Sequence, residues 1–569
     1  MNNQNFITGE ILLRAIQSQT VTPSAKFERR DFVEPLIKFC LDNDYRAKIG
    51  IVYGLRSTGK TVGMLQAADE LISQGHKVAY ARFNYKTTGM RDANTEILKL
   101  VEEGVTHFFI DEASYLSGFL HESAEWADTF VPCNRIKIIV SGTDSFELWL
   151  AMGRALYHRY VRFSTNFCSY PEYKRVWAKS YDEYKVKGGV FLSEEVNAEL
   201  EPLTQQHRES TSIYENFIKD AIVTNLMRTL EHVNEYGGVG KYYAEWLYAI
   251  DEQVIYKGVI AILKSTVESY IKKNFIKEAR NKNIPKLGEI ISKWSDADKS
   301  DIKERIANAM GIYQNSIKID KPAGSIEALM QFLVKIGCLL EGETSTSDMI
   351  EGQKTFYFGH NALMNYAIEE TKLGIEQLEG INSDDFKDSL QQAAEGSLNE
   401  NIVYTHLTLA CRGDEKIFRY RDADAREVDA VIISRKNKTV KLFEVKSKAK
   451  IDVSRIASNE ARHLLDEAVI KSIGAEDFTI TRVVVSKNNT GFAVSKDNVL
   501  LLVNIEDLLV HHKDLTSYLD RLMTDAEKAH DEHSSKSMLE KLHTHNENLK
   551  HEQPLIVKSK TKSKTAPEV

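Results

Sequence analysis

A glycine-rich segment near the N-terminus carries the clearest chemical pattern in the sequence. It fits GxxxxGK[ST] at every fixed position, and its residues are Gly54, Leu55, Arg56, Ser57, Thr58, Gly59, Lys60 and Thr61. An apolar run precedes it and a helical stretch follows, and in that context N–H groups of the loop and the helix N-terminus can hold phosphate oxygens. Lys60 is expected to reach the β- and γ-phosphates, and the Thr61 hydroxyl to bind Mg²⁺. The pattern therefore predicts a binding loop for ATP and Mg²⁺; a plain glycine-rich turn is the alternative.

Two acids and a polar strand end are expected to complete this site. Asp111 and Glu112 close the apolar run at residues 106–112. At the end of a neighbouring strand, Asp111 would orient Mg²⁺ through water and Glu112 would polarise the attacking water. The next apolar run ends in polar residues, of which Ser141 or Thr143 is expected to sense the γ-phosphate. A solvated strand end is the alternative for each of these residues.

A second group of charged residues lies near the C-terminus, on two predicted strands joined by a short polar turn. Asp429 lies on the first strand, and Glu444 and Lys446 lie on the second. Because side chains alternate along a strand, Glu444 and Lys446 share a face. Converging carboxylates suit Mg²⁺ or Mn²⁺, and a nearby lysine can activate water or stabilise charge on a phosphate. The alternative is an ordinary charged strand with cross-strand ion pairs.

The elements that must position these residues predict a multidomain α/β protein. Short apolar strands alternate with helical segments in the first third, which favours a mostly parallel sheet with helices on both faces. Aromatic-rich helical segments follow, and then helices with a small hairpin, the layout of a winged helix. Mixed strands and helices return before a polar tail. The predicted divisions are an N-terminal segment, a nucleotide-binding α/β domain, a helical domain, a winged-helix-like domain, a C-terminal α/β domain and a partly disordered tail, at residues 1–24, 25–180, 181–298, 299–385, 386–524 and 525–569.

Composition narrows the class of protein. Of 569 residues, 42% are hydrophobic and 27% are charged, so several cores can form, and a net charge of −8 excludes a chain that is basic throughout. The five cysteines form no CxxC pair, which argues against a disulfide scaffold or zinc ribbon. The N-terminal residues do not form a secretory signal, and no apolar run reaches the roughly 18 residues of a membrane span. We therefore expect a cytoplasmic protein without a membrane partner, and a solvated tail whose irregularly spaced histidines bind no metal.

The sequence resembles the ATPase core of AAA-superfamily proteins of bacteria and archaea. The resemblance rests on GLRSTGKT, FIDEASYL, IIVSGTDS and HRYVRFSTNFCSYPEY, the last of which puts Arg159 where that family has a Gly-Arg pair. His158 replaces the glycine. The resemblance implies a P-loop NTPase sheet and implies that Arg159 reaches the γ-phosphate as an arginine finger or sensor; an ordinary ion pair is the alternative.

The C-terminal part resembles the PD-(D/E)XK nuclease-like fold, a domain that this AAA family commonly carries. Asp429 and the Glu444–Lys446 pair match its signature, and Gly396–Glu400 matches the opening of its preceding helix, so the resemblance implies that Glu400 is a further acid near the metal. With Glu400, Asp429 and Glu444 as ligands and Lys446 as a catalytic residue, the domain would hydrolyse phosphodiester bonds. A fold retained for binding alone is the alternative.

Together these patterns predict an ATP-binding, ATP-hydrolysing protein whose nucleotide state controls a C-terminal module that acts on DNA or RNA. A non-nucleolytic switch that docks a protein partner through the C-terminal fold is the competing hypothesis. A motor that loads or remodels a partner is the third, and it predicts nucleotide-dependent oligomers.

Overall fold

The computed structural model describes most of the chain outside the predicted helical middle and the tail. The described residues are 5–21, 26–46, 48–83, 89–142, 145–177, 179–189, 333–345, 353–376, 384–422, 426–446, 461–487, 490–495 and 498–529, with isolated residues between 218 and 271. The predicted helical domain, the first winged-helix-like helix and the histidine-bearing tail therefore lie almost wholly outside them. Among the helices that are described, none combines the length and the apolar character needed to cross a membrane.

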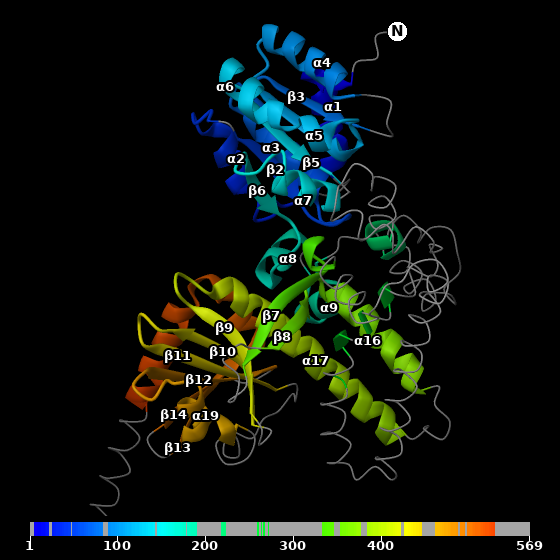
Figure 1. The fold of residues 1–569 in the computed structure, drawn as a ribbon. Helices are drawn as coiled ribbons and strands as arrows, with labels where there is room; N and C mark the ends of the chain where they lie inside the picture. Colours follow the sequence, from blue (N-terminus) through cyan, green and yellow to red (C-terminus); the bar gives the residue numbers. More distant parts are fainter. Residues whose placement is uncertain are drawn as a thin grey trace, which may run out of the picture.

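The N-terminal part contains a six-stranded sheet, the N-terminal sheet, with helices on both faces (Figure 1). The strand order is β1-β3-β4-β5-β2-β6, and every neighbouring pair is parallel except β1 with β3. This confirms the predicted parallel sheet. Its strands are β1 (Phe6–Thr8), β2 (Ile49–Tyr53), β3 (Val78–Arg82), β4 (His107–Asp111), β5 (Lys137–Ser141) and β6 (Tyr160–Ser164). Its helices are α1 (Gly9–Thr20), α2 (Val33–Leu41), α3 (Lys60–Ser73), α4 (Met90–Glu102), α5 (Phe119–Glu122), α6 (Val131–Asn134) and α7 (Ser145–Gly153), with single turns at Ala113–Tyr115 and Trp126–Phe130.

Alternation along the central strands divides the core between the two faces of this sheet. Ile51 and Tyr53 of β2 belong to one buried cluster, whereas Val52 between them belongs to the other. Phe108 and Phe109 of β4 divide in the same way. Because both faces are covered, the strands are continuous apolar runs rather than alternating ones, which is why the sequence predicted them as buried parallel strands.

The C-terminal part contains an eight-stranded mixed sheet, the C-terminal sheet, in the order β13-β14-β12-β11-β10-β9-β7-β8. The pairs β11–β12, β12–β14 and β7–β9 are parallel and the others are antiparallel. Its strands are β7 (Leu339–Ser345), β8 (Gln353–Phe358), β9 (Lys416–Arg421), β10 (Glu427–Ser434), β11 (Thr439–Lys446), β12 (Thr479–Ser486), β13 (Gly491–Ser495) and β14 (Asn498–Asn504). The helices of this part are α16 (Asn361–Glu376), α17 (Asp384–Ala410), α19 (Glu467–Ser472) and α20 (Ile505–Val510), with single turns at Arg462–Leu465 and His512–Asp514.

The β7–β8 hairpin lies at the predicted residues, but it belongs to the C-terminal sheet rather than to a separate winged-helix-like domain. The two strands pair as expected, with Leu339 opposite Phe358, but β7 also pairs with β9 through Thr344 and Arg419. The hairpin thus extends the C-terminal sheet, and the boundary at residues 385–386 does not separate two sheets. Sequence pattern predicts a hairpin because its turn is local, but it does not reveal which distant strand pairs with the hairpin's free edge.

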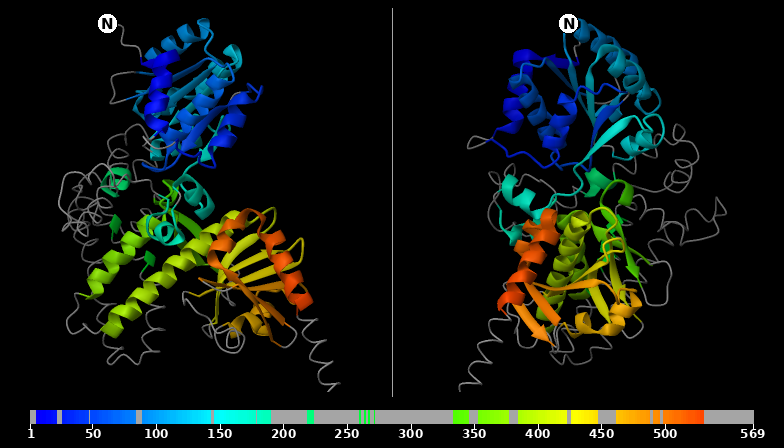
Figure 2. Two further views of the ribbon diagram at one scale, coloured as in Figure 1. Left: turned by 180° about the vertical axis from the view of Figure 1, so that it is seen from behind. Right: turned by 90° about the vertical axis from the view of Figure 1, so that its left-hand side faces the viewer.

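Two short helices, α8 (Tyr170–Trp177) and α9 (Tyr181–Lys187), lie between the two sheets (Figures 1 and 2). The backbone N–H of Tyr170 donates to Nε2 of His406 on α17 at 2.9 Å, and the Tyr170 hydroxyl donates to Glu506 on α20 at 2.5 Å. Near the C-terminus, Lys513 bonds to Asp31 at 2.6 Å. The two parts are therefore joined by polar contacts, of which the Tyr170–His406 bond is buried, as well as by the chain.

Candidate functional site

The segment Gly54–Thr61, called here the phosphate loop, connects β2 to the N-terminus of α3. Gly59 caps α3 at φ +82°, a left-handed conformation that favours glycine. A Cβ atom on Gly54 would lie 2.1 Å from Oγ1 of Thr165 and 2.8 Å from Oδ1 of Asn166. The two glycines of the pattern are therefore required for different reasons, one by its backbone conformation and one by the closeness of the chain beyond β6.

Lys60 is buried at the centre of the phosphate loop. Its ammonium group donates to the carbonyl oxygens of Gly54 at 2.8 Å and Leu55 at 2.7 Å. Burial lowers the pKa of Lys60 to about 8, although Glu112 and Asp111 oppose that shift. A phosphate group would supply the negative charge that this buried cation lacks in direct contact, so the loop fits a phosphate ligand.

Asp111 gathers hydroxyl groups from three other elements. Its Oδ2 accepts from Thr61 at 2.7 Å and from Tyr80 at 3.0 Å, and its Oδ1 accepts from Ser141. Asp111 is 1% exposed. The hydroxyl and carboxylate predicted to bind Mg²⁺ thus lie side by side, and Ser141 rather than Thr143 is the strand-end residue seen here, because Thr143 lies outside the described residues.

Glu112 follows Asp111 with φ +59°, a left-handed conformation uncommon for residues other than glycine. Such a conformation costs roughly 1–3 kcal/mol, so it persists only where the surrounding structure holds it in place, and it is common at functional sites. It turns the chain out of β4 and into the turn at Ala113–Tyr115. The Glu112 carboxylate lies close enough to the Lys60 ammonium to favour that group's charged form.

Arg159 lies at the opposite end of the N-terminal sheet from the phosphate loop. Its carbonyl oxygen accepts from the N–H of Ile49, the first residue of β2, whereas the loop follows the last residue of that strand. At about 3.3 Å per residue the two ends are separated by roughly 13 Å or more. The Arg159 side chain pairs instead with Asp128 at 2.6 Å. Arg159 therefore does not reach the phosphate loop of its own chain and forms an ion pair, the alternative considered above, while its role as an arginine finger stays a prediction.

His158 explains why the turn before Arg159 survives without glycine. Its φ is +61°, the left-handed conformation that a glycine at this position would adopt most readily. The backbone shape that the family pattern implies is thus retained with a different side chain.

A buried arginine holds the phosphate loop from the N-terminal side, and no sequence pattern indicated it. Arg30 donates to the carbonyl oxygens of Thr58 at 2.5 Å and Thr165 at 3.1 Å. It also pairs with the carboxylate of Glu172 on α8 at 2.8 Å, and these two side chains are 6% and 4% exposed. Arg30 stands alone in the sequence, so only the fold shows its role. The polar residues Thr165 and Asn166 end an apolar run, and that signal, which drew attention to Ser141, would have found them.

Two of the predicted C-terminal acids lie on neighbouring strands at paired positions, and an arginine lies among the acids. The β10–β11 register pairs Ala430 with Phe443, which sets Asp429 beside Glu444, and Oδ2 of Asp429 accepts from the N–H of Val445 at 2.8 Å. Arg419 on β9 lies 2.7 Å from Glu400 of α17 and 4.0 Å from Asp429. Glu427 lies 3.6 Å from the same guanidinium.

Glu444 has its own cationic partners. Lys446 donates to one carboxylate oxygen at 2.5 Å, and Nε2 of His463 lies 2.8 Å from the other. Burial alone would raise the pKa of Glu444, but Lys446 and His463 together hold that pKa well below its usual range. Over the part of the chain that the structure describes, no group of three or more histidine, cysteine, aspartate or glutamate residues is arranged to hold a metal ion. The predicted ligand set of Glu400, Asp429 and Glu444 is therefore bound internally by Arg419 and Lys446.

Two family models match parts of the chain, and the first of them covers the phosphate loop. Residues 46–174 match a family model described as an AAA domain. This match, together with the parallel sheet, supports an AAA-type P-loop ATPase domain in this part of the chain. Residues 395–490 match a second model, described as a domain of unknown function, DUF4143. No curated protein matches the chain. The AAA match supports ATP as the ligand of the phosphate loop and Mg²⁺ as its usual companion, while the nuclease-like identity of the C-terminal part stays a prediction.

The side chains of the AAA domain fit a magnesium–nucleotide complex. Lys60 can exchange its two carbonyl partners for phosphate oxygens, and Thr61 and Asp111 bring a hydroxyl and a carboxylate to one point. Hard oxygen ligands of this kind are those that Mg²⁺ prefers. When bound, Mg²⁺ would neutralise charge on the phosphates, and the protein supplies the groups that orient it.

Proposed function

We propose that this chain is an ATP-dependent switch whose C-terminal domain binds a protein partner and does not cleave nucleic acid. The observation that carries the proposal is the guanidinium of Arg419, which lies 2.7 Å from Glu400 and also contacts Glu427 and Asp429. Because the Arg419 guanidinium already balances the charge of these buried carboxylates, they attract a metal ion only weakly. The fold would then serve as a docking surface rather than as a catalyst.

ATP hydrolysis resets the switch in this proposal. Lys60 binds the β- and γ-phosphates, and Thr61 and Asp111 orient Mg²⁺. Glu112 accepts the proton of the attacking water, and its left-handed backbone supports this role by fixing where its side chain leaves the chain.

A metal-dependent nuclease is the second candidate, and one observation favours it. Asp429, Glu444 and Lys446 lie on adjacent strands with His463 nearby, an arrangement that could activate water if Arg419 withdrew. In this case nucleotide binding would have to move Arg419 away from Glu400.

The test is a cleavage assay on labelled single- and double-stranded DNA and RNA, with Mg²⁺ or Mn²⁺ and with or without ATP. Wild type, Lys60→Ala and Glu444→Gln are compared, and Glu415→Gln is the matched control because it disturbs an ion pair with Lys441 elsewhere on β11. The switch proposal expects no cleavage by wild type. Cleavage that disappears in Glu444→Gln but not in Glu415→Gln would establish the nuclease instead.

The switch itself is tested by limited proteolysis of the full chain. We expect Mg²⁺ with a non-hydrolysable ATP analogue to change the cleavage pattern of the C-terminal domain in wild type and to leave it unchanged in Lys60→Ala. An identical pattern with and without bound nucleotide would rule out a switch.

A further inference from the structure

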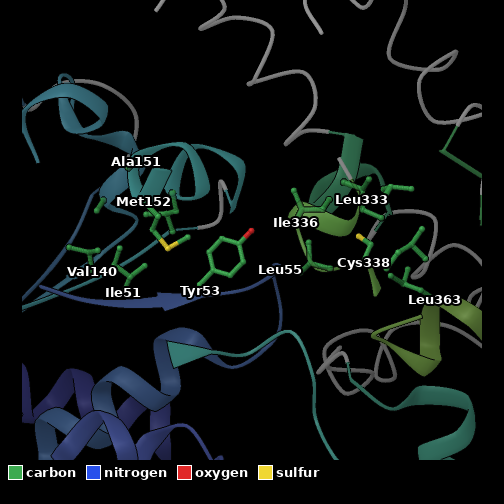
Figure 3. Close-up of a cluster of buried hydrophobic side chains, with 14 of the residues drawn as sticks. Ile51, Tyr53, Leu55, Val140, Ala151, Met152, Leu333, Ile336, Cys338 and Leu363 are labelled. Carbon is green, nitrogen blue, oxygen red and sulfur yellow. The ribbon is translucent and has the colours of Figure 1, made fainter. Parts of the chain in front are cut away.

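Leu55 of the phosphate loop lies in a buried cluster that also contains residues of the C-terminal part. The side chain of Leu55 belongs to the same buried cluster as Leu333, Ile336 and Cys338, the residues that lead into β7 (Figure 3). The hydroxyl of Tyr53, the last residue of β2, donates to the carbonyl oxygen of Lys335 in the same segment. A residue of the phosphate loop therefore shares a buried cluster with the segment that leads into β7.

The backbone of Leu55 is held at both ends. Its carbonyl oxygen accepts from the Lys60 ammonium at 2.7 Å and from the Thr58 hydroxyl at 2.7 Å. Its N–H donates to Oδ1 of Asn166 at 3.1 Å. The position of Leu55 thus depends on where the Lys60 ammonium is directed, and on Asn166.

Asn166 also contacts the β7–β8 hairpin. Gly337, two residues before β7, has φ +87°, and a Cβ atom there would lie 1.9 Å from Nδ2 of Asn166. Gly359, directly after β8, donates its N–H to the carbonyl of Cys338 at 3.1 Å. A Cβ atom on Gly359 would lie 3.0 Å from the Gly337 carbonyl and 3.6 Å from that of Asn166. Asn166 therefore fills the space at the ends of both strands of the hairpin.

We propose that Leu55 and Asn166 are positioning residues that report the nucleotide state of Lys60 to the β7–β8 hairpin. Phosphate oxygens compete with the carbonyl oxygens of Gly54 and Leu55 for the Lys60 ammonium, so binding removes a bond from Leu55. Asn166 fills the space beside Gly337, so Asn166 cannot move without also moving Gly337, because protein interiors are close-packed. A displacement of Leu55 and Asn166 is consequently passed to Gly337 and to β7, which pairs with β9, the strand of Arg419.

This inference rests on the proposed switch, and the experiment separates the two. Hydrogen exchange of β7 and β8 is measured in the full chain with and without Mg²⁺ and the ATP analogue AMP-PNP, and the dissociation constant of AMP-PNP is measured alongside. In wild type we expect the nucleotide to change exchange in the hairpin by about fivefold or more. Asn166→Ala and Gly337→Ala should bind AMP-PNP within about tenfold of wild type but lose most of that change.

Two variants serve as controls. Gly75→Ala carries the same backbone penalty, since Gly75 also has φ +87°, but nothing lies within 4 Å of the added Cβ atom. Asn166→Asp retains the shape and the acceptor for the Leu55 N–H; its added charge should weaken AMP-PNP binding, so it is compared at saturating AMP-PNP. Both should respond to AMP-PNP as wild type does.

The outcomes are distinct. If hydrogen exchange in the wild-type hairpin is the same with and without bound nucleotide, the proposed switch is refuted. A wild-type response that persists in Asn166→Ala and Gly337→Ala would refute the relay and leave the switch standing. Loss of AMP-PNP binding in both folded variants would also overturn the relay, because the residues would then belong to the binding site itself.

Discussion

Replacing Arg419 with methionine tests whether this side chain is the internal counter-ion of the C-terminal acids. The change removes the charge and keeps most of the side-chain volume. Glu400 and Asp429 are 6% and 5% exposed, so they would remain buried without their partner. For charges 2.7 Å apart, an effective dielectric constant of 20 gives an attraction of about 6 kcal/mol, part of which desolvation offsets. Breaking such a buried pair from one side costs about 3–5 kcal/mol, and we expect a loss of that size.

The assay is native-state hydrogen exchange at α17, β9 and β10. A multidomain chain does not unfold in a single step, so local protection is more informative than one melting temperature. Lys438→Ala is the matched control, because Lys438 pairs with Asp477 on the same domain but both side chains are more than 60% exposed. Its loss should be at most about 1 kcal/mol.

A double variant sharpens this test. Arg419→Met combined with Glu400→Leu replaces the closest buried pair with apolar groups and should recover part of the lost protection, since Asp429 and Glu427 still lose the cation. A loss below about 1 kcal/mol in the single variant would refute the assignment of Arg419 as counter-ion. Protection restored to Arg419→Met by Mn²⁺ alone would show that the acids form a cation site, and would favour the nuclease candidate.

Three further predictions concern the AAA domain. The pKa of Lys60 in the free protein is about 8, and a neighbouring phosphate favours the charged form, so ATP binding should take up a proton above about pH 8 and ATP affinity should fall as pH rises. Calorimetry near pH 9 in two buffers of different ionisation enthalpy measures this proton uptake. A binding reaction that takes up no proton would contradict the prediction. Arg30→Ala should destabilise the domain by about 3–5 kcal/mol and weaken ATP binding, because the buried carboxylate of Glu172 loses its ion-pair partner Arg30. Unfolding followed by tryptophan fluorescence measures the lost stability, with Arg30→Lys as control. Gly63→Ala would put a Cβ atom 2.2 Å from the Phe32 ring and should cost about 1–3 kcal/mol, whereas Gly153→Ala, with nothing within 4 Å, should cost nothing in the same measurement.

The sequence predicted those features whose signal is local. The N-terminal sheet is readable because each of its strands is a short apolar run covered on both sides, and the phosphate loop is readable because its glycines and lysine have fixed spacing. The position of Asp111 followed because parallel strands end at one edge of the sheet. The meeting of Asp429 with Glu444 followed from a short hairpin, in which the turn sets the register.

Features that depend on distant partners were not predictable in the same way. Arg30 and Glu172 pair across 142 residues, and neither belongs to a local pattern. Arg419 occupies a strand that the sequence indicates, but its neutralising role appears only when α17 brings Glu400 to that strand. Arg159 lies far from the phosphate loop of its own chain, which the motif did not reveal, because a family motif specifies an order along the chain and not the end of the sheet at which the residue lies.

The contacts that join the two parts differ in chemistry, and the difference shows where nucleotide-driven movement is least costly. At α8, the Tyr170 N–H donates to Nε2 of His406, so the proton of that ring is on Nδ1, which bonds the carbonyl of Ile402 at 2.8 Å. Burial lowers the pKa of His406 to about 3, which keeps the ring neutral and the bond intact near neutral pH. Breaking it would strand buried polar groups at a cost of about 1–3 kcal/mol each. The Leu55 side chain meets the segment before β7 through apolar atoms, which can shift with a smaller polar penalty, so the hairpin at Gly337, rather than α8, is the place where the state of the phosphate loop should be read.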